Sequence, residues 1–279
     1  MCVNTIKTVI FIIKTKDAEK ERAKSMAIKI AIANQKGGVG KTTTALALAS
    51  GLKELGKKVL MVDTDPQRNT TKVYGAKTEG VATLYDIIFA GFKAKDVIQK
   101  TEYGDIIASD RNLINADTQV KPGPGMYKYI KNAVSSVEKN YDYIIFDTPP
   151  HTGVLLGNVL MSAENIIIPC TADSFGIQGI TDFAETINEY KEDNKKLKIL
   201  GLLIIKYKGR QSLTKDIEEN LLPSYAKSLK TKVFETRIRE SVKCQEAQTL
   251  NRSLLSYAPN ATTSEDYRAL INEIMEVAK

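Results

Sequence analysis

The sequence has few of the residue types from which metal centres, disulfide networks and membrane spans are built. His151 is its single histidine, which argues against a histidine-based metal site and a Ser-His-Asp triad. The three cysteines, Cys2, Cys170 and Cys244, lie far apart and form no C-x-x-C pair, as in a reduced cytoplasmic protein. No apolar run approaches the ~18 residues of a membrane span, and the run at residues 9–13 is shorter than a signal peptide's apolar core.

Charge is the compositional feature that points to a partner. The 279-residue chain carries a net charge of +7, and its 43% hydrophobic content is sufficient for a sizeable core. Residues 195–243 contain thirteen Lys/Arg against five Asp/Glu, so this segment alone holds as much excess positive charge as the whole chain. Such a balance favours nucleic acid or an anionic membrane surface as the partner.

A glycine-rich stretch, Lys36-Gly37-Gly38-Val39-Gly40-Lys41-Thr42, has the form of a phosphate-binding loop. Glycines let backbone N–H groups surround phosphate oxygens, the lysine after them reaches the β- and γ-phosphates, and the next hydroxyl ligates Mg²⁺. The usual spacing G-x-x-x-x-G-K-[ST] is not met, because Lys36 stands where the first glycine is expected. The alternative is a glycine-rich turn with two solvated lysines, but an apolar run before the loop and a helical pattern after it favour the nucleotide site.

Strand-like and helix-like segments alternate from residue 26 onward. This alternation predicts a single α/β domain over 26–279: a doubly wound, mostly parallel sheet with helices on both faces. Strands are expected at 28–33, 58–63, 105–109, 141–147, 165–169 and 198–205, with a short one at 232–234. Helices are expected at 43–55, 83–91, 94–100, 126–139, 175–194, 217–229 and 264–277.

Residues 1–25 stand apart from this pattern. They consist of a short apolar run followed by a charged, helix-prone segment. We interpret them as an appended N-terminal arm or extension, with Met26 as a possible natural start; an edge strand or a dimerisation arm are the alternatives.

Carboxylates follow two of the predicted strands. Asp63 and Asp65 end the strand at 58–63, and Asp147 ends the strand at 141–147. Because ligands bind at the carboxyl ends of parallel strands, we expect these residues near the phosphate loop. One carboxylate can then hold Mg²⁺ through water while another positions the attacking water. For Asp147 the alternative is a helix-capping or turn aspartate.

These segments together resemble the ParA-type partition ATPases of the deviant Walker A group, which also contains MinD and the nitrogenase iron protein. The resemblance rests on KGGVGKTTT, VDTDPQRN, YDYIIFDTPP, IIIPCTADSFGIQGI, GLLIIKYKGRQSL and VFETRIRESVKCQEA, and covers residues 28 to about 270. Because the nucleotide fold begins near residue 28, the chain is most similar to the small, Soj-like class that lacks a separate helix-turn-helix domain.

The resemblance implies a role for each matching residue. Lys36 would cross a homodimer interface to the partner's nucleotide, and Asp65 would orient the hydrolytic water. With Lys41 these are the expected catalytic residues, while Mg²⁺ would be held by Thr42, Asp63 and Asp147. The residues expected to bind ATP are Lys36, Gly37, Gly38, Val39, Gly40, Lys41, Thr42 and Thr43.

Two residues depart from the family pattern. Arg68 replaces the glycine of the usual DPQGN, where a side chain could alter the hydrolytic turn. His151 replaces a small polar residue after DTPP, and we interpret it as a neutral switch-region residue in preference to a proton-transfer group.

The basic segment is expected to bind duplex DNA without sequence preference, through phosphate contacts. A solvated basic face is the alternative. Arg210 matches a basic residue that the family uses on DNA. The other candidates are Lys206, Lys208, Lys230, Lys232, Arg237, Arg239 and Lys243.

The function implied is that of a slow, partner-stimulated ATPase that segregates a plasmid or chromosome. Its ATP-bound dimer would bind DNA until a centromere-binding partner, either ParB-like or a ribbon-helix-helix protein, stimulates hydrolysis. The expected location is cytoplasmic and nucleoid-associated, without stable membrane association. The alternative is a MinD-like spatial regulator of cell division, which needs a basic amphipathic anchor; the acidic helix at 264–277 is expected to pack on the core instead. An iron-protein function lacks the cysteines that would hold its cluster.

Overall fold

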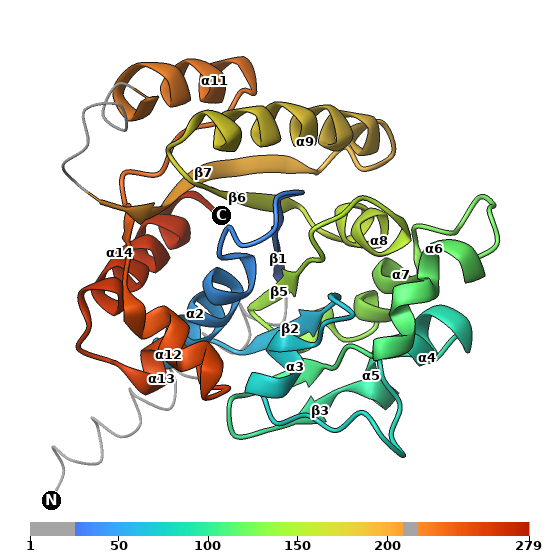
Figure 1. Ribbon diagram of the computed structural model, residues 1–279. Helices are drawn as coiled ribbons and strands as arrows, with labels where there is room; N and C mark the ends of the chain where they lie inside the picture. The colour runs from blue at the N-terminus through green and yellow to red at the C-terminus, as the bar shows by residue number, and fades with distance from the viewer. Residues whose placement is uncertain (1–25, 209–216, 279) are drawn as a thin grey trace, which may run out of the picture.

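A computed structural model describes residues 26–208 and 217–278. Within them, eight strands form one sheet in the order β3-β4-β2-β5-β1-β6-β7-β8 (Figure 1). All neighbouring strands are parallel except β3 and β4, which confirms the predicted sheet. The strands are β1 (Ile28–Ile32), β2 (Val59–Asp63), β3 (Gln99–Lys100), β4 (Asp105–Ile107), β5 (Tyr143–Asp147), β6 (Asn165–Cys170), β7 (Lys198–Tyr207) and β8 (Ile238–Arg239).

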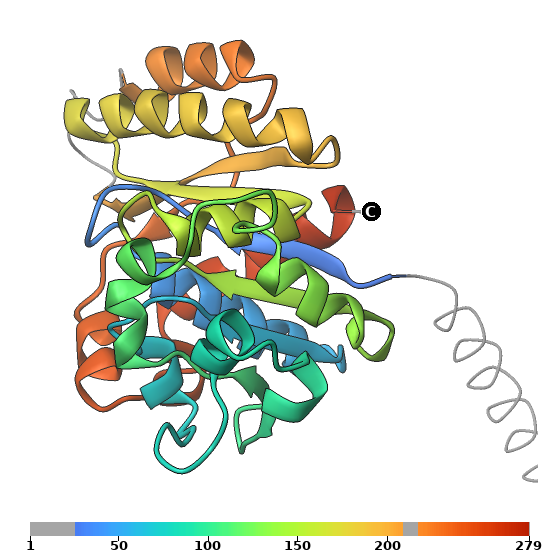
Figure 2. The ribbon, with the colours of Figure 1, turned by 90° about the vertical axis from the view of Figure 1, so that its right-hand side faces the viewer.

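Helices cover both faces of this sheet, as predicted. One face packs against α2 (Lys41–Glu54), α3 (Asn69–Val73), α12 (Val242–Thr249), α13 (Leu254–Tyr257) and α14 (Thr262–Val277). The other packs against α4 (Leu84–Phe89), α5 (Ala94–Val97), α6 (Ala116–Gln119), α7 (Tyr129–Ser135), α8 (Val154–Ser162), α9 (Ser174–Asp193), the π-turn η3 (Ile217–Leu221) and α11 (Leu222–Ser228). Short 3₁₀ turns occur at η1 (Arg111–Asn115) and η2 (Glu138–Asn140). The turned view shows α9 and α11 one above the other beyond β7 (Figure 2).

The two-residue period of the strands divides the core into two clusters. Ile144 and Phe146 of β5 face the α7–α9 side, whereas Ile145 faces α2. All three are fully buried. A strand covered on both faces reads as a continuous apolar run, which is why the central strands were predictable from sequence.

Several sequence predictions at the periphery are wrong in extent. The helix expected at 94–100 ends at Val97, and Gln99 and Lys100 instead pair antiparallel with β4. The helix expected at 126–139 is divided into α7 and η2, and the strand expected at 232–234 is a single bridge between Val233 and Leu202. The expectations for residues 1–25 lie outside the described residues.

The last helix packs on α2, as expected. Leu270, Ile271 and Ile274 of α14 are buried, and Gly51 of α2 provides the space that the Ile271 side chain fills. The apolar stripe of α14 is therefore used inside the fold. No helix in residues 26–208 and 217–278 is long and apolar enough to cross a bilayer.

Candidate nucleotide site

The phosphate loop joins the end of β1 to the start of α2. Gly38 and Gly40 have φ angles of +70° and +69°, a left-handed conformation that favours glycine. Asn34 holds the loop's entry: its Nδ2 donates to the carbonyl of Pro169, and its Oδ1 accepts from the backbone N–H of Lys36 at 2.9 Å. The loop is thereby anchored to β6 and leads into the N-terminus of α2, where backbone N–H groups favour anions.

Lys41 lies under the loop and is almost fully buried. Its Nζ donates to the carbonyl oxygen of Lys36 at 3.0 Å. Burial lowers the pKa of Lys41, and the negative charges of Asp147 and Asp65 oppose that shift. This ammonium is therefore positioned by the loop backbone and lies in the field of two carboxylates, as expected of a phosphate-binding lysine.

Lys36 has a different environment. Its Nζ lies 3.5 Å from Asp173 Oδ1, and the side chain is 36% exposed. Its backbone carbonyl serves Lys41 while its ammonium lies at the rim of the loop. The backbone carbonyl of Lys36 thus binds Lys41, and its side-chain ammonium makes a second contact at the rim.

The predicted carboxylates meet at the ends of β2 and β5, where Asp63 and Asp147 are direct register partners. Both are fully buried. Asp63 Oδ2 accepts from the N–H and Oγ1 of Thr71, and its Oδ1 accepts from the N–H of Asp65. Burial, reinforced by the charge of Asp147, raises the pKa of Asp63. Both oxygens of Asp63 are thus already engaged by the β2–α3 turn.

Asp147 differs from Asp63 in having one carboxylate oxygen available for a ligand. Its Oδ2 accepts from Thr70 Oγ1 at 2.8 Å, whereas its buried Oδ1 accepts no hydrogen bond of good geometry among the described residues. Burial raises the pKa of Asp147, although the Thr42 hydroxyl lies close enough to the carboxyl to lower it. A buried orphan oxygen beside the phosphate loop fits a divalent cation or its water shell. No group of three or more His, Cys, Asp or Glu side chains suited to a metal lies in the described chain, so remaining ligands would come from the nucleotide, water and a hydroxyl such as that of Thr42.

Asp65 lines the open side of the site. It is 9% exposed, and its Oδ1 accepts from the N–H of Gln67 at 2.9 Å. That bond fixes the carboxylate without removing it from the pocket. Of the three predicted carboxylates, Asp65 lines the pocket and Asp63 and Asp147 do not; Glu240 lines it from the β8 side.

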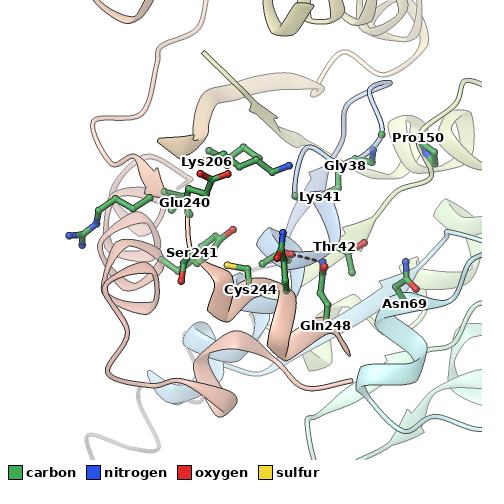
Figure 3. Close-up of a pocket in the computed structure, with 18 of the residues that line it drawn as sticks. Gly38, Lys41, Thr42, Asn69, Pro150, Lys206, Glu240, Ser241, Cys244 and Gln248 are labelled. Carbon is green, nitrogen blue, oxygen red and sulfur yellow. Dashed lines mark hydrogen bonds between the residues drawn. The ribbon is translucent and has the colours of Figure 1, made fainter. Parts of the chain in front are cut away.

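The pocket above the loop has a volume of about 410 Å³. Six of the eight predicted loop residues line its floor, namely Gly37, Gly38, Gly40, Lys41, Thr42 and Thr43, whereas Lys36 and the buried Val39 do not. Its opposite wall was not predicted: it comes from the end of β7, from β8 and from α12, and includes Ser241, Cys244 and Gln248 (Figure 3). Gln248 Nε2 donates to Thr43 Oγ1 at 3.0 Å and so closes the α12 side of the loop. The rule that loops after parallel strands meet at one edge could have located this wall, but β8 is only two residues long.

Lys206, predicted to contact DNA, also lines this pocket. The β7–β8 register shifts between Ile205 and Tyr207, and Lys206 itself has a φ of +54°. Such a bulge redirects a side chain. Here the Lys206 side chain extends toward the phosphate loop (Figure 3).

The remaining basic candidates lie on several elements near both ends of β7 instead of forming one cluster, and Arg239 on β8 also lines the nucleotide pocket. Lys208 lies at the end of β7 and pairs with Glu240 at 3.1 Å, whereas Lys230 precedes Thr231, which bonds to Ile199 near the strand's start. About eight residues of strand separate these ends, roughly 26 Å. Lys232, Arg239 and Lys243 pair with Glu273, Asp266 and Glu246 respectively. Arg237 lies 5.5 Å from the centre of the Tyr207 ring. Arg210 falls outside the described residues.

The two departures from the family pattern flank the site. Arg68 adopts a left-handed φ of +60° at the start of α3, and its Nη1 donates to Thr78 Oγ1. The backbone thus keeps a glycine-like conformation although the residue is arginine. His151 is exposed in the loop between β5 and α8, next to the pocket residue Pro150.

A parallel sheet, a glycine loop leading into a helix, a buried lysine and strand-end carboxylates define the class of P-loop nucleotide-binding proteins. The sequence model of the AAA domain family matches residues 27–199. The chromosome-partitioning ATPase Soj of Thermus thermophilus is 32% identical over 249 residues, 88% of this chain and 95% of that protein. The sporulation initiation inhibitor protein Soj of Bacillus subtilis is 34% identical over 249 residues, 88% of this chain and 97% of that protein.

The chain belongs to the Soj/ParA family of partition ATPases, and it is an ATPase. Among solved structures, cobyrinic acid a,c-diamide synthase from Mycobacterium smegmatis, with bound ADP and magnesium, has a TM-score of 0.76 at 25% identity, covering 90% of this chain and 95% of that one. An enzyme of different chemistry thus shares the fold, so the finer function has to be argued from the site.

Proposed function

We propose that this chain is a DNA-partition ATPase whose ATP-bound homodimer binds duplex DNA without sequence preference. A centromere-binding partner, ParB-like or of ribbon-helix-helix type, stimulates hydrolysis and so releases the dimer from DNA. The observation that carries the proposal is that two parts of Lys36 point to different places. Its backbone carbonyl binds Lys41 inside the site, while its side-chain ammonium lies at the rim of the loop. Relatives named as partition ATPases support it.

ATP is the nucleotide that we assign to the pocket, with Mg²⁺ as its cation. The N–H groups of residues 37–40 surround the phosphates, Lys41 neutralises the β- and γ-phosphates, and the hydroxyls of Thr42 and Thr43 complete the contacts. Thr42 and Asp147 are the residues that would hold Mg²⁺, with the buried Oδ1 of Asp147 as the available carboxylate oxygen. Asp63, whose two oxygens accept hydrogen bonds from Asp65 and Thr71, would act on the cation only through water. When bound, Mg²⁺ neutralises charge on the transferring phosphoryl group.

Hydrolysis requires a positioned water, and Asp65 is the carboxylate placed to orient it. It lies on the pocket wall and is fixed by the N–H of Gln67. Asp63 acts behind it: its Oδ1 accepts the N–H of Asp65, so it positions the turn that carries the catalytic group.

A homodimer would explain why the phosphate loop contains Lys36 in addition to Lys41. In a symmetric dimer whose phosphate loops face each other, the ammonium of Lys36 reaches the partner's nucleotide. Gly37 suits such an approach, since no atom of the described residues, apart from Gly37 and its two chain neighbours, lies within 4 Å of a Cβ built there. ATP then acts as part of the interface, and loss of its γ-phosphate weakens the dimer.

DNA binding is assigned to the basic segment 195–243. Its ion pairs are exposed on the lysine side, and surface ion pairs contribute little to stability. Exchanging a glutamate partner for a DNA phosphate therefore costs little, while counterion release favours the complex. Binding of this kind would place the protein on the nucleoid.

The packing of the last helix does not favour the MinD-like alternative, whose fold this chain shares. The helix that would have to act as an amphipathic anchor, α14, buries its apolar stripe against α2. A membrane-binding role would need that face released.

DNA co-sedimentation with ATP, ADP or no nucleotide tests the proposal, beside a parallel liposome assay. We expect DNA retention with ATP alone, falling steeply with salt. Arg210→Ala should reduce retention without affecting ATP binding, whereas Lys121→Ala, an exposed lysine outside the basic segment, should change neither. ATP-independent or salt-insensitive retention, or ATP-dependent binding to liposomes alone, would contradict the proposal.

A further inference from the structure

A second basin opens at the end of the sheet opposite the phosphate loop, where β2 and β4 begin. Its volume is about 550 Å³, within the roughly 300–1,000 Å³ of small-molecule sites. It shares no lining residue with the nucleotide pocket. Val59, at its edge, is four residues from Asp63 along β2, about 13 Å of strand. The basin is therefore separate from the ATPase site.

Lysines from several elements converge on this basin, which we call the lysine basin. It is lined by Lys53, Lys57, Lys58, Lys95 and Lys100. They come from the end of α2, the turn before β2, α5 and β3. Because elements distant in sequence supply them, their convergence is a property of the fold and not of a single charged stretch.

Little negative charge balances these lysines. Asp105 is the one acidic residue in the described lining, and its Oδ2 already accepts the Tyr141 hydroxyl at 2.8 Å. Lys53 Nζ donates to the backbone carbonyl of Glu102 at 2.7 Å. No ion pair within 4 Å joins the other four lysines to a residue in 26–208 or 217–278. One further carboxylate lies beside the basin, because the backbone N–H of Lys58 donates to Asp142 Oδ2 at 2.7 Å. Like charges held together in a concavity attract a polyanion.

Tyrosine rings form the apolar part of the same basin. Tyr74 and Tyr103 have ring centroids 6.0 Å apart at an angle of 46°, and Tyr141 lies beside them in the lining. Tyr74 is only 6% exposed. Burial raises the pKa of Tyr74, so the phenol remains a hydrogen-bond donor.

A simpler explanation accounts for only part of this arrangement. Lys53 lies in the last turn of α2, where a cation stabilises the helix dipole and is solvated. That explanation does not apply to Lys100, which lies on a strand, and it gives no reason for the tyrosines. Phosphates bind lysine ammonium groups, and heterocyclic bases stack on aromatic rings.

We propose that the lysine basin binds a nucleoside polyphosphate, with the lysines on the phosphates and the tyrosines on the base. The site is independent of the partition function proposed above. Occupancy adds negative charge beside the end of α2, the helix that begins at the phosphate loop.

Counting nucleotide sites tests the proposal. Equilibrium dialysis of the full chain with radiolabelled ATP and Mg²⁺ should give two sites per chain. Lys57→Ala/Lys100→Ala should weaken one of them about thirtyfold, since a charge contact at ~4 Å in water is worth roughly a fivefold change in affinity. The matched control, Lys121→Ala/Lys131→Ala, removes the same charge from exposed positions outside the basin and should keep both sites. Lys41→Ala should weaken the other site.

Photo-crosslinking locates the second site independently of affinity. With 8-azido-ATP, peptides containing Tyr103 or Tyr141 should be labelled, and the Lys57→Ala/Lys100→Ala variant should lose that label while retaining label at the ATPase pocket. A single site per chain, or a second site unchanged by the basin substitutions, would overturn the proposal. So would basin variants that lose duplex DNA binding but keep both nucleotides, which would assign the lysines to DNA.

Discussion

Replacing Lys36 by alanine should separate nucleotide binding from dimerisation. Within one chain the substitution removes little: the Lys36–Asp173 pair spans 3.5 Å, with side chains 36% and 47% exposed. An exposed pair of this kind contributes at most about 1 kcal/mol. The carbonyl that holds Lys41 belongs to the backbone and remains. The ATP affinity of the monomer should therefore change by less than about fivefold.

The dimer should lose far more. A hydrogen bond to a charged group in a desolvated site is worth about 1.5–3 kcal/mol. Two-fold symmetry removes two such contacts at once, about 3–6 kcal/mol, so the dimer Kd should rise by about 10²–10⁴.

Sedimentation velocity with a non-hydrolysable ATP analogue gives the dimer Kd, and fluorescent-nucleotide titration of dilute protein gives monomer affinity. Lys93→Ala, an exposed lysine before α5, is the control and should change neither. The reasoning is refuted if dimerisation is unaffected, or if monomer affinity falls by as large a factor as the dimer constant.

Three further substitutions test the site and its support. Asp65→Ala should retain ATP binding but lower turnover by about 10²–10⁴; normal turnover in a phosphate-release assay would remove Asp65 from the water-positioning role. Gly201→Ala should destabilise by about 1–3 kcal/mol, because a Cβ there would lie 2.5 Å from the buried Phe234 ring. Thermal unfolding should show a Tm lower by roughly 2–4 °C per kcal/mol, and Phe234→Leu in the same chain should restore part of it; purely additive losses would contradict this packing. Arg68→Gly should be more stable than Arg68→Ala by about 1 kcal/mol, since both lose the same side chain but only glycine suits a φ of +60°; equal unfolding midpoints in urea would show that the turn relaxes.

The part of the site nearest the sheet centre was predictable from sequence for a physical reason. β1, β2 and β5 are buried on both faces, so each reads as an apolar run with a functional residue at its end, and adjacent parallel strands bring those ends together. The meeting of Asp63 and Asp147 follows directly from that pairing.

The sequence patterns of the other parts of the fold around the site were weaker predictors of structure. α8 buries all nine of its residues and so shows no amphipathic period, and β8 has only two residues. The position of Lys206 depends on a bulge that composition does not reveal. The lysine basin joins residues from four separate segments (49–59, 74, 95–105 and 137–141), none of which carries a motif.

Asp147 also supports the turn that carries Asp65. Its carbonyl accepts from both the N–H and Oγ1 of Thr64, and its Oδ2 accepts from Thr70, so β5 holds the β2–α3 turn at two points. A displacement of the end of β5 therefore also moves Asp65, the carboxylate to which we assign the orientation of water. A substitution of Asp147 should thus change both the affinity for Mg²⁺ and the rate of ATP hydrolysis. Variants that change the rate but not the magnesium requirement should be sought at Gln67 and Arg68 instead.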